Sequence, residues 1–177
     1  MGDLRPHPPS MVLVAVITRH DEALAWARER AVERWGPVAE ESPTFRFDET
    51  SYYDATMGTG LGKTFLTFAP GYDPGELAAD KHLTNSWEAE YAAPARHAEL
   101  RPLNLDPGYL TAAKLVLAST KDHAHRIYLG DGMFAEITLF YRHGAWQAHE
   151  FTFPDYRRAD YHAFFSACRK RLSGKQP

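Results

Sequence analysis

Hydrophobic residues near the start of the chain form an unbroken run instead of alternating with polar ones. Residues 12–18 are all apolar or β-branched, which is typical of a buried strand. A helix should follow, because Thr18 begins a capping-box-like pattern with Asp21 and apolar residues then recur at helical spacing. These residues are Leu24, Ala27, Ala31 and Trp35, and Gly36-Pro37 predicts the end of the helix.

The next segment repeats this order of strand and helix. Residues 44–48 alternate, with two phenylalanines on one face, and residues 65–68 predict another short strand. The polar, glycine-rich segment 49–62 between them is expected to be a loop. Residues 73–76 read Asp-Pro-Gly-Glu, which predicts a capped helix start, and Pro94 should end that helix.

A further strand is expected at residues 100–105, and the pattern then changes. Residues 106–110 repeat the Asp-Pro-Gly opening, so we expect a short helix at residues 109–119. Period-two alternation follows in three stretches, which predicts an antiparallel meander and then a last helix at residues 157–172. The strands are expected at 125–129, 133–141 and 145–153, joined by turns at Asp131-Gly132 and His143-Gly144.

Together these elements predict an α+β protein. The first part reads β-α-β-β-α-β, which is compatible with a ferredoxin-like unit, and a helix, the meander and the C-terminal helix follow. Residues 1–10 hold three prolines and are expected to be a disordered leader. Residues 11–177 are expected to form a single α+β domain, with two packed lobes at 11–105 and 106–177 as the alternative.

Composition narrows the classes of partner. A net charge of -3 gives no general attraction to nucleic acid or to an anionic membrane. The longest apolar run near the start is too short to span a bilayer, so we expect no membrane partner. Cys168 is the only cysteine, which excludes an intrachain disulfide and suits the cytoplasm. It falls on the apolar face of the last helix and should be inert. A homo-oligomer stays open.

Three stretches are distinctive. They are V-A-V-I-T near the start, the long segment 103–132, which reads LNLDPGYLTAAKLVLASTKDHAHRIYLGDG, and F-P-D-Y-R at 153–157. In these stretches the chain resembles the bacterial domain-of-unknown-function family 4416, over almost its whole length after the leader. The resemblance implies no reaction, cofactor or catalytic residue. Some members carry a GTP-binding label.

Residues 58–64 read GTGLGKT and superficially resemble a phosphate-binding loop. That motif needs four residues between its first glycine and G-K-T, a buried strand before it and a helix after it. Here three residues separate the glycines, and the segment that follows is short and β-like. We therefore disfavour GTP binding through a P-loop and expect Lys63 to be exposed on a flexible loop.

The meander brings candidate catalytic residues together. With two-residue turns, His125 and His149 would both pair with Thr138 on one face, and Glu136 would lie beside them. Such a set suits acid–base chemistry; no metal is predicted, but a metal here would be held by these residues and His123. A three-residue turn would instead pair Arg126 with Glu136 and send His125 to the other face. A solvated or satisfied polar face is the plainer interpretation.

A second candidate site surrounds the helix expected at residues 109–119. The N-terminus of that helix, together with Lys121 and Arg126, could hold an anion. Asn104, Asp106 and Tyr109 lie beside it. Capping of that helix by Asp106 is the simpler explanation of the aspartate. Tyr52 and Tyr53, in the polar loop, could form a binding rim.

The leading hypothesis is a domain that binds, or an enzyme that acts on, a small polar metabolite, which we expect to be anionic. His125 and Glu136 would be its acid–base groups, and Lys121 and Arg126 would hold the anion. The alternative is a non-enzymatic module for protein interaction or RNA binding. RNA is disfavoured, because neither a basic excess nor an aromatic RNA-binding signature is present.

Overall fold

One antiparallel sheet of nine strands runs through the protein, in a computed structural model that describes residues 2–172. Met1 of the expected leader and residues 173–177 of the expected domain lie outside the described residues. The strand order is β2-β4-β1-β5-β6-β8-β7, with β3 also pairing with β4 and β9 with β8. The strands are β1 (Ser10–Thr18), β2 (Val38–Glu41), β3 (Phe45–Phe47), β4 (Leu61–Phe68), β5 (Leu103–Thr111), β6 (Lys114–Ser119), β7 (Ile127–Gly130), β8 (Met133–Arg142) and β9 (Ala145–Ala148).

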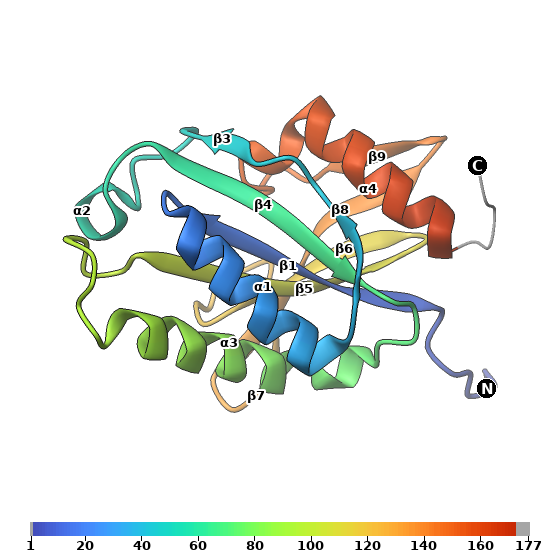
Figure 1. Ribbon diagram of the computed structural model, residues 1–177. Helices are drawn as coiled ribbons and strands as arrows, with labels where there is room; N and C mark the ends of the chain where they lie inside the picture. The colour runs from blue at the N-terminus through green and yellow to red at the C-terminus, as the bar shows by residue number, and fades with distance from the viewer. Residues whose placement is uncertain (1, 173–177) are drawn as a thin grey trace.

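Helices cover both faces of this sheet. They are α1 (Asp21–Trp35), the short α2 (Asp54–Met57), α3 (Leu77–Ala92) and α4 (Ala159–Leu172), with 3-10 turns η1 (Pro74–Glu76) and η2 (Asp155–Arg157). Helices α1 and α3 lie over one face, and α4 lies over the other (Figure 1). The mixed α/β class is therefore confirmed, and the sheet is larger than the sequence predicts.

Strand β1 is the centre of the core because it is buried from end to end. Its alternate side chains enter two different apolar clusters. Val12, Val14 and Val16 pack toward α1 and α3, whereas Leu13 and Ala15 pack toward α4. The buried strand predicted from the unbroken apolar run is therefore found, and the structure shows that it is buried on both faces.

Several predicted elements appear with altered bounds. The first helix is found as α1, but its N-cap is His20, whose side chain makes no capping hydrogen bond. Asp73 does cap the next helical segment, since its carboxylate accepts a hydrogen bond from the Gly75 amide. The meander is present as β7, β8 and β9, with β9 ending at Ala148, five residues before the predicted end. The strand β2 was not predicted.

The helix expected at residues 109–119 is wrong. This segment forms the end of β5, a tight turn and β6. The Thr111 hydroxyl accepts hydrogen bonds from the amides of Ala113 and Lys114 and so closes the turn. Asp106 consequently caps no helix and lies within β5. The buried residues of this segment are Leu110 on β5 and residues 115–118 on β6.

The sheet forks at β5. Strand β1 pairs with β5 over its whole length, but β6 pairs with β5 only at Gly108–Leu110. Gly108 is needed at this point, because a Cβ atom there would lie 2.2 Å from the carbonyl oxygen of Val116 on β6. Beyond it, β6 continues along β8 to Ser119, so residues 103–107 of β5 have no strand neighbour on that side among the described residues.

The glycine-rich segment before β4 is not an extended loop. Residues 54–57 form α2, and β4 already begins at Leu61. Lys63 therefore lies inside a strand, and its side chain is 4% exposed rather than free on a loop. No helix directly follows Gly62-Lys63-Thr64 in the described chain, because β4 continues to Phe68.

Residues 2–9, which belong to the expected leader, form no regular secondary structure and are exposed. Strand β5 crosses positions 105 and 106, where the boundary between two lobes was the alternative. Across residues 2–172, no helix combines the length and the apolar character needed to cross a bilayer.

Candidate functional site

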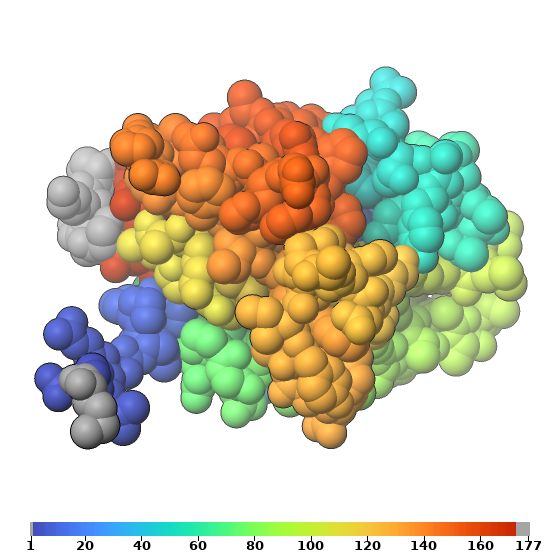
Figure 2. Space-filling model, turned by 180° about the vertical axis from the view of Figure 1, so that it is seen from behind, coloured from blue at the N-terminus to red at the C-terminus, as the bar shows by residue number. Residues whose placement is uncertain are grey.

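The fork in the sheet opens a cleft of about 480 Å³, which we call the fork cleft. Strands β4 and β5 and helix α3 form one side of it, and β6, the segment after β6 and β8 form the other. The segments around residues 47–53 and 153–156 close its ends, and Figure 2 shows that they meet the segment near residue 123 on one face. Its charged lining residues are Glu49, Lys63, Lys81, Arg101, Asp106, Lys121, Arg126, Glu136 and Asp155.

A buried ion pair closes the inner end of the fork cleft. The Lys63 ammonium on β4 donates to the carboxylate of Asp155 at the start of η2, and both side chains are almost completely buried. The ammonium also lies 4.5 Å from the ring centre of Phe47 and 4.6 Å from that of Tyr156. Asp155 lies at the start of η2, shortly before the last helix, and its carboxylate is used by Lys63.

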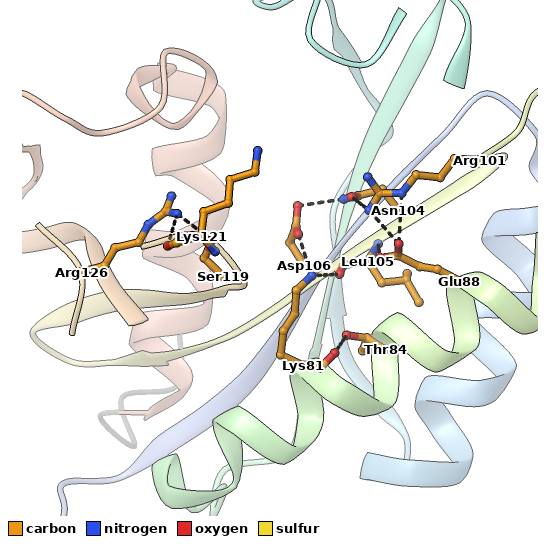
Figure 3. A network of polar contacts seen from close by, with 10 residues as sticks. All are labelled: Lys81, Thr84, Glu88, Arg101, Asn104, Leu105, Asp106, Ser119, Lys121 and Arg126. Carbon is orange, nitrogen blue, oxygen red and sulfur yellow. Dashed lines mark hydrogen bonds and ion pairs between the residues drawn. The ribbon is translucent and has the colours of Figure 1, made fainter. Parts of the chain in front are cut away.

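Helix α3 supplies side chains to the free edge of β5, as Figure 3 shows. The Lys81 ammonium donates to the Leu105 carbonyl at 2.8 Å and to the Asp106 carboxylate at 3.1 Å. The Glu88 carboxylate lies about two turns further along the same face of α3. It accepts hydrogen bonds from the Leu105 amide at 2.7 Å and from the Arg101 guanidinium. These side chains take the place of a neighbouring strand, so the backbone of Leu105 is satisfied.

The charged groups along this edge shift the pKa values of its two acids, Asp106 and Glu88. Burial alone would raise the pKa of Asp106, but the charges of Lys81 and Lys63 outweigh it and hold the pKa below its usual range. Burial raises the pKa of Glu88, although Lys81 and Arg101 oppose the shift. Asp106 is therefore the stronger of the two acids at this wall.

Arg126 and Glu136 form a second buried pair on the opposite wall. Arg126 Nε donates to Glu136 Oε2 at 2.9 Å, and the two side chains are 4% and 1% exposed. The guanidinium also donates to the Ser119 hydroxyl and to the Lys121 carbonyl, which fixes the segment between β6 and β7. Glu136 accepts further hydrogen bonds from His125 Nε2 at 3.2 Å and from the Thr138 hydroxyl at 3.0 Å.

The register that makes this pair is not the one that would align His125 with Thr138. Asp131 and Gly132 form a two-residue turn with positive φ at both positions, as predicted. A bulge between Tyr128 and Gly130 then shifts the pairing by one residue, so Ile127 lies opposite Ala135. Arg126 directly precedes β7 and meets Glu136 through its side chain, and these are the two residues that the alternative brought together. His125 lies in a separate turn directly before β7, and its side chain reaches Glu136 from there.

Lys121 is the cation that projects into the fork cleft most freely. Its side chain rises between Arg126 and Asp106, and no contact joins its ammonium to the other residues drawn in Figure 3. Within the described chain, its ammonium contacts only Tyr52, with a 2.7 Å hydrogen bond to the phenol and 4.1 Å to the ring centre. That hydrogen bond lowers the pKa of Tyr52. A neutral phenol leaves the positive charge of Lys121 available to an anion.

The remaining histidines do not join Glu136 as ligands. Phe151 stacks on His125 with ring centres 4.1 Å apart and on His149 at 4.9 Å, so its ring lies against both histidines. His149 was predicted on the face of Glu136, but β9 ends before it, and its buried Nε2 has no hydrogen-bond partner among residues 2–172. His123 lines the fork cleft and stacks on His125. Among the described residues, no group of three metal-ligand side chains forms here.

The structure thus brings together most residues of the two sites expected separately. Lys121, Arg126, Asn104, Asp106 and Glu136 all line the fork cleft, and His125 contacts it through Glu136. Tyr109 does not belong there. Alternate side chains of a strand point to opposite faces, and Tyr109 packs near Tyr72 on the α3 side of β5.

Five charged residues of the cleft were not predicted: Glu49, Lys63, Lys81, Arg101 and Asp155. Two of them carried a signal in the sequence. Lys81 lies four residues after the apolar Leu77, so the two share one face of α3, and both are buried. Lys63 precedes Phe65 by two residues and therefore shares its inward face. A charge at a core-facing position indicates a buried partner.

Comparison with known proteins gives a family and no function. The family described as Domain of unknown function (DUF4416) matches residues 8–172, which is nearly the whole chain. No curated protein and no solved structure matches it.

Proposed function

The chain belongs to the DUF4416 family, and since its description names no function, we propose one from the fork cleft. The protein binds a small polar metabolite with an acidic group, a carboxylate or a phosphate, in this cleft. The observation that carries the proposal is the ammonium of Lys121, which enters a cleft of about 480 Å³ and is held there by a neutral phenol. That volume suits a small molecule.

The other charges of the cleft support a ligand that is polar throughout. Lys63, Lys81 and Arg126 are each neutralised by a carboxylate, so they supply fixed polar walls more than free charge. Asn85 and Asn104 add amide groups to the same lining. An acidic group would pair with Lys121, and the rest of the ligand would meet donors and acceptors whose positions are already fixed.

Binding is supported more strongly than acid–base catalysis by His125 and Glu136. The two oxygens of Glu136 already accept from Arg126, His125 and Thr138. Taking a proton from a ligand would break one of these hydrogen bonds. We therefore assign Glu136 and His125 to the positioning of Arg126 and of the segment that carries Lys121.

Native mass spectrometry of the untagged protein, followed by thermal shift with added ligands, tests this proposal. We expect a stoichiometric adduct, or a stabilising shift with one of a panel of dicarboxylates and phosphate monoesters. Lys121→Met should weaken that binding about 10–100-fold, because a hydrogen bond to a charged group contributes about 1.5–3 kcal/mol. Lys114→Met is the matched control, since Lys114 lies at the other end of β6 and outside the lining.

Two results would contradict the proposal. One is an unliganded mass together with no shift from any acid in the panel. The other is a ligand whose affinity is equal in the wild-type protein and in Lys121→Met, because the acidic group would then be held elsewhere.

A module for protein interaction is the second candidate, and one observation favours it. Edge strand β7 exposes three consecutive apolar residues, Ile127 at 70%, Tyr128 at 60% and Leu129 at 42%. An exposed apolar edge strand is a template for pairing with another chain. Light scattering after size-exclusion chromatography would show a concentration-dependent dimer that Ile127→Lys dissociates; a monomer at all concentrations would argue against self-association.

The ferredoxin-like assignment also belongs among these proposals. The strand order β2-β4-β1-β5, with α1 and α3 on one face, supports a ferredoxin-like unit that β6, β7, β8 and β9 extend. An experimental structure in which β5 did not lie beside β1 would remove this support.

A further inference from the structure

A second cluster of chemically active side chains lies away from the fork cleft, at the start of α1. His20 precedes the helix, Glu22 is in its first turn, and His97 lies in the segment after α3. One ligand atom from each residue can be chosen so that all three lie within 4.8 Å of one another. None of the three lines the fork cleft.

We propose that His20, Glu22 and His97 bind a divalent transition-metal ion of the zinc type. Two imidazoles and a carboxylate are a ligand set that Zn²⁺ uses in sites with an open position. Oxygen-preferring ions such as Mg²⁺ would be selected against by the two nitrogen ligands. Three protein ligands would leave a fourth tetrahedral position for water or an anion.

The surroundings of the two histidines resemble the outer partners of a metal site. His20 Nε2 lies 3.2 Å from Glu99 Oε2, and His97 Nε2 lies 3.1 Å from the Tyr91 hydroxyl. Metal-ligating histidines commonly use one ring nitrogen for such a partner and the other for the metal. Each ring keeps a second nitrogen for which the described chain shows no hydrogen bond.

The fold holds the cluster in place before any ion arrives. The Thr18 hydroxyl donates to the Pro102 carbonyl at 2.8 Å and accepts from the His20 amide at 3.1 Å. This ties the start of α1 to the segment that carries His97. The two imidazole rings are therefore neighbours, with centres 4.0 Å apart and a tilt of 32°. Because an imidazole binds a metal in the plane of its ring, the rings must turn about their side-chain bonds when an ion binds.

Local charge also favours a cation. The dipole of α1 is unfavourable to a positive ion at its start. Asp21 and Glu22 in the first turn and Glu99 beside His20 offset that effect, whereas Arg19 neutralises part of Glu99 through a contact of 3.2 Å.

Substituting Glu22 distinguishes a metal site from a pair of histidines with only a structural role. Its side chain is exposed, so Glu22→Gln should leave the stability unchanged. Glu29 is its matched control, because it is exposed on the same helix two turns further along. Only a metal ligand would make these two substitutions differ in Zn²⁺ binding.

The test is isothermal titration of the full chain with ZnCl₂, with MgCl₂ as the second titrant, and circular dichroism of each variant. We expect saturable binding of Zn²⁺ at one site and no binding of Mg²⁺. Glu22→Gln should weaken Zn²⁺ binding at least about tenfold, because losing even a residue that only supports a metal ligand costs about 10–100-fold in affinity. Glu29→Gln should leave Zn²⁺ binding unchanged. His97→Ala should abolish it.

The proposal is overturned if the wild-type chain binds no Zn²⁺. It is also overturned if Glu22→Gln binds Zn²⁺ as the wild type does, because the ion would then be held by other residues. A folded His97→Ala variant with unchanged affinity would lead to the same conclusion. None of these results depends on the occupant of the fork cleft.

Discussion

Removing the carboxylate of Asp155 should destabilise the protein far more than removing a carboxylate from its surface. Asp155 and Lys63 are 4% and 3% exposed, and the Lys63 ammonium has aromatic rings on two sides. In Asp155→Asn this ammonium would lose its ion partner inside the protein. A buried charge without a partner is costly, because neither water nor a counter-charge stabilises it.

The expected loss can be estimated from the burial of the pair. Removing one member of a buried ion pair costs about 3–5 kcal/mol. For a chain of this length, that loss corresponds to a fall in Tm of about 6–20 °C. Replacing both members with apolar residues, in Lys63→Met/Asp155→Leu, should return the free energy of unfolding to near the wild-type value or above it.

Urea unfolding of the wild-type protein, both single variants and the double variant gives the coupling between the two residues. Asp48→Asn is the surface control. Asp48 lies 2.6 Å from Arg46, but their side chains are 52% and 82% exposed. Its removal should cost less than about 1 kcal/mol.

The reasoning is refuted if Asp155→Asn is no more destabilising than Asp48→Asn, since the Lys63 charge would then be solvated. A stable double variant would add a functional test. If that variant folds and no longer binds the ligand of the fork cleft, then Lys63 and Asp155 serve binding rather than stability.

Three further predictions follow from single features. Because the pKa of Asp106 is lowered in the folded protein, its ionised form adds stability above the pKa of the unfolded chain, which is about 4. Below pH about 4 this contribution should decrease as the pH falls in the wild-type protein but not in Asp106→Asn, and urea unfolding at several pH values measures the difference. Gly108→Ala should cost about 1–3 kcal/mol or more, because the new Cβ would meet the Val116 carbonyl, and calorimetry measures this loss. Cys168, whose pKa burial raises to about 12, should react with a thiol reagent at pH 8 only after unfolding.

The sequence predicts best where local pattern and tertiary packing agree. The apolar run of β1, the periodic face of α1 and the turn at His143-Gly144 are all found, because each depends on residues close together in the chain. The helix expected at residues 109–119 fails for the opposite reason. Asp106-Pro107-Gly108 resembles a helix start, but Gly108 is there for the close approach of β6, a contact that no local pattern reveals.

The candidate site shows the same division. Glu136 was predicted from the pairing of the meander, and Lys121 and Arg126 from their place beside an expected helix, and all three line the fork cleft. Their geometry depends on the bulge in β7, which shifts the pairing of β7 with β8 by one residue and which the turn sequence alone does not encode. Lys63 and Asp155 are 92 positions apart, so only the folded sheet brings them together.

The way in which α3 covers β5 limits the kind of molecule that can enter the fork cleft. An extended peptide binds a free sheet edge through the amides and carbonyls that point outward from it. At this edge, both outward groups of Leu105 are already taken by Lys81 and Glu88, and two residues further on Pro107 has no amide hydrogen to offer. A peptide strand therefore cannot pair with this edge of β5. The cleft instead suits a compact molecule that is bound by the side chains of its lining.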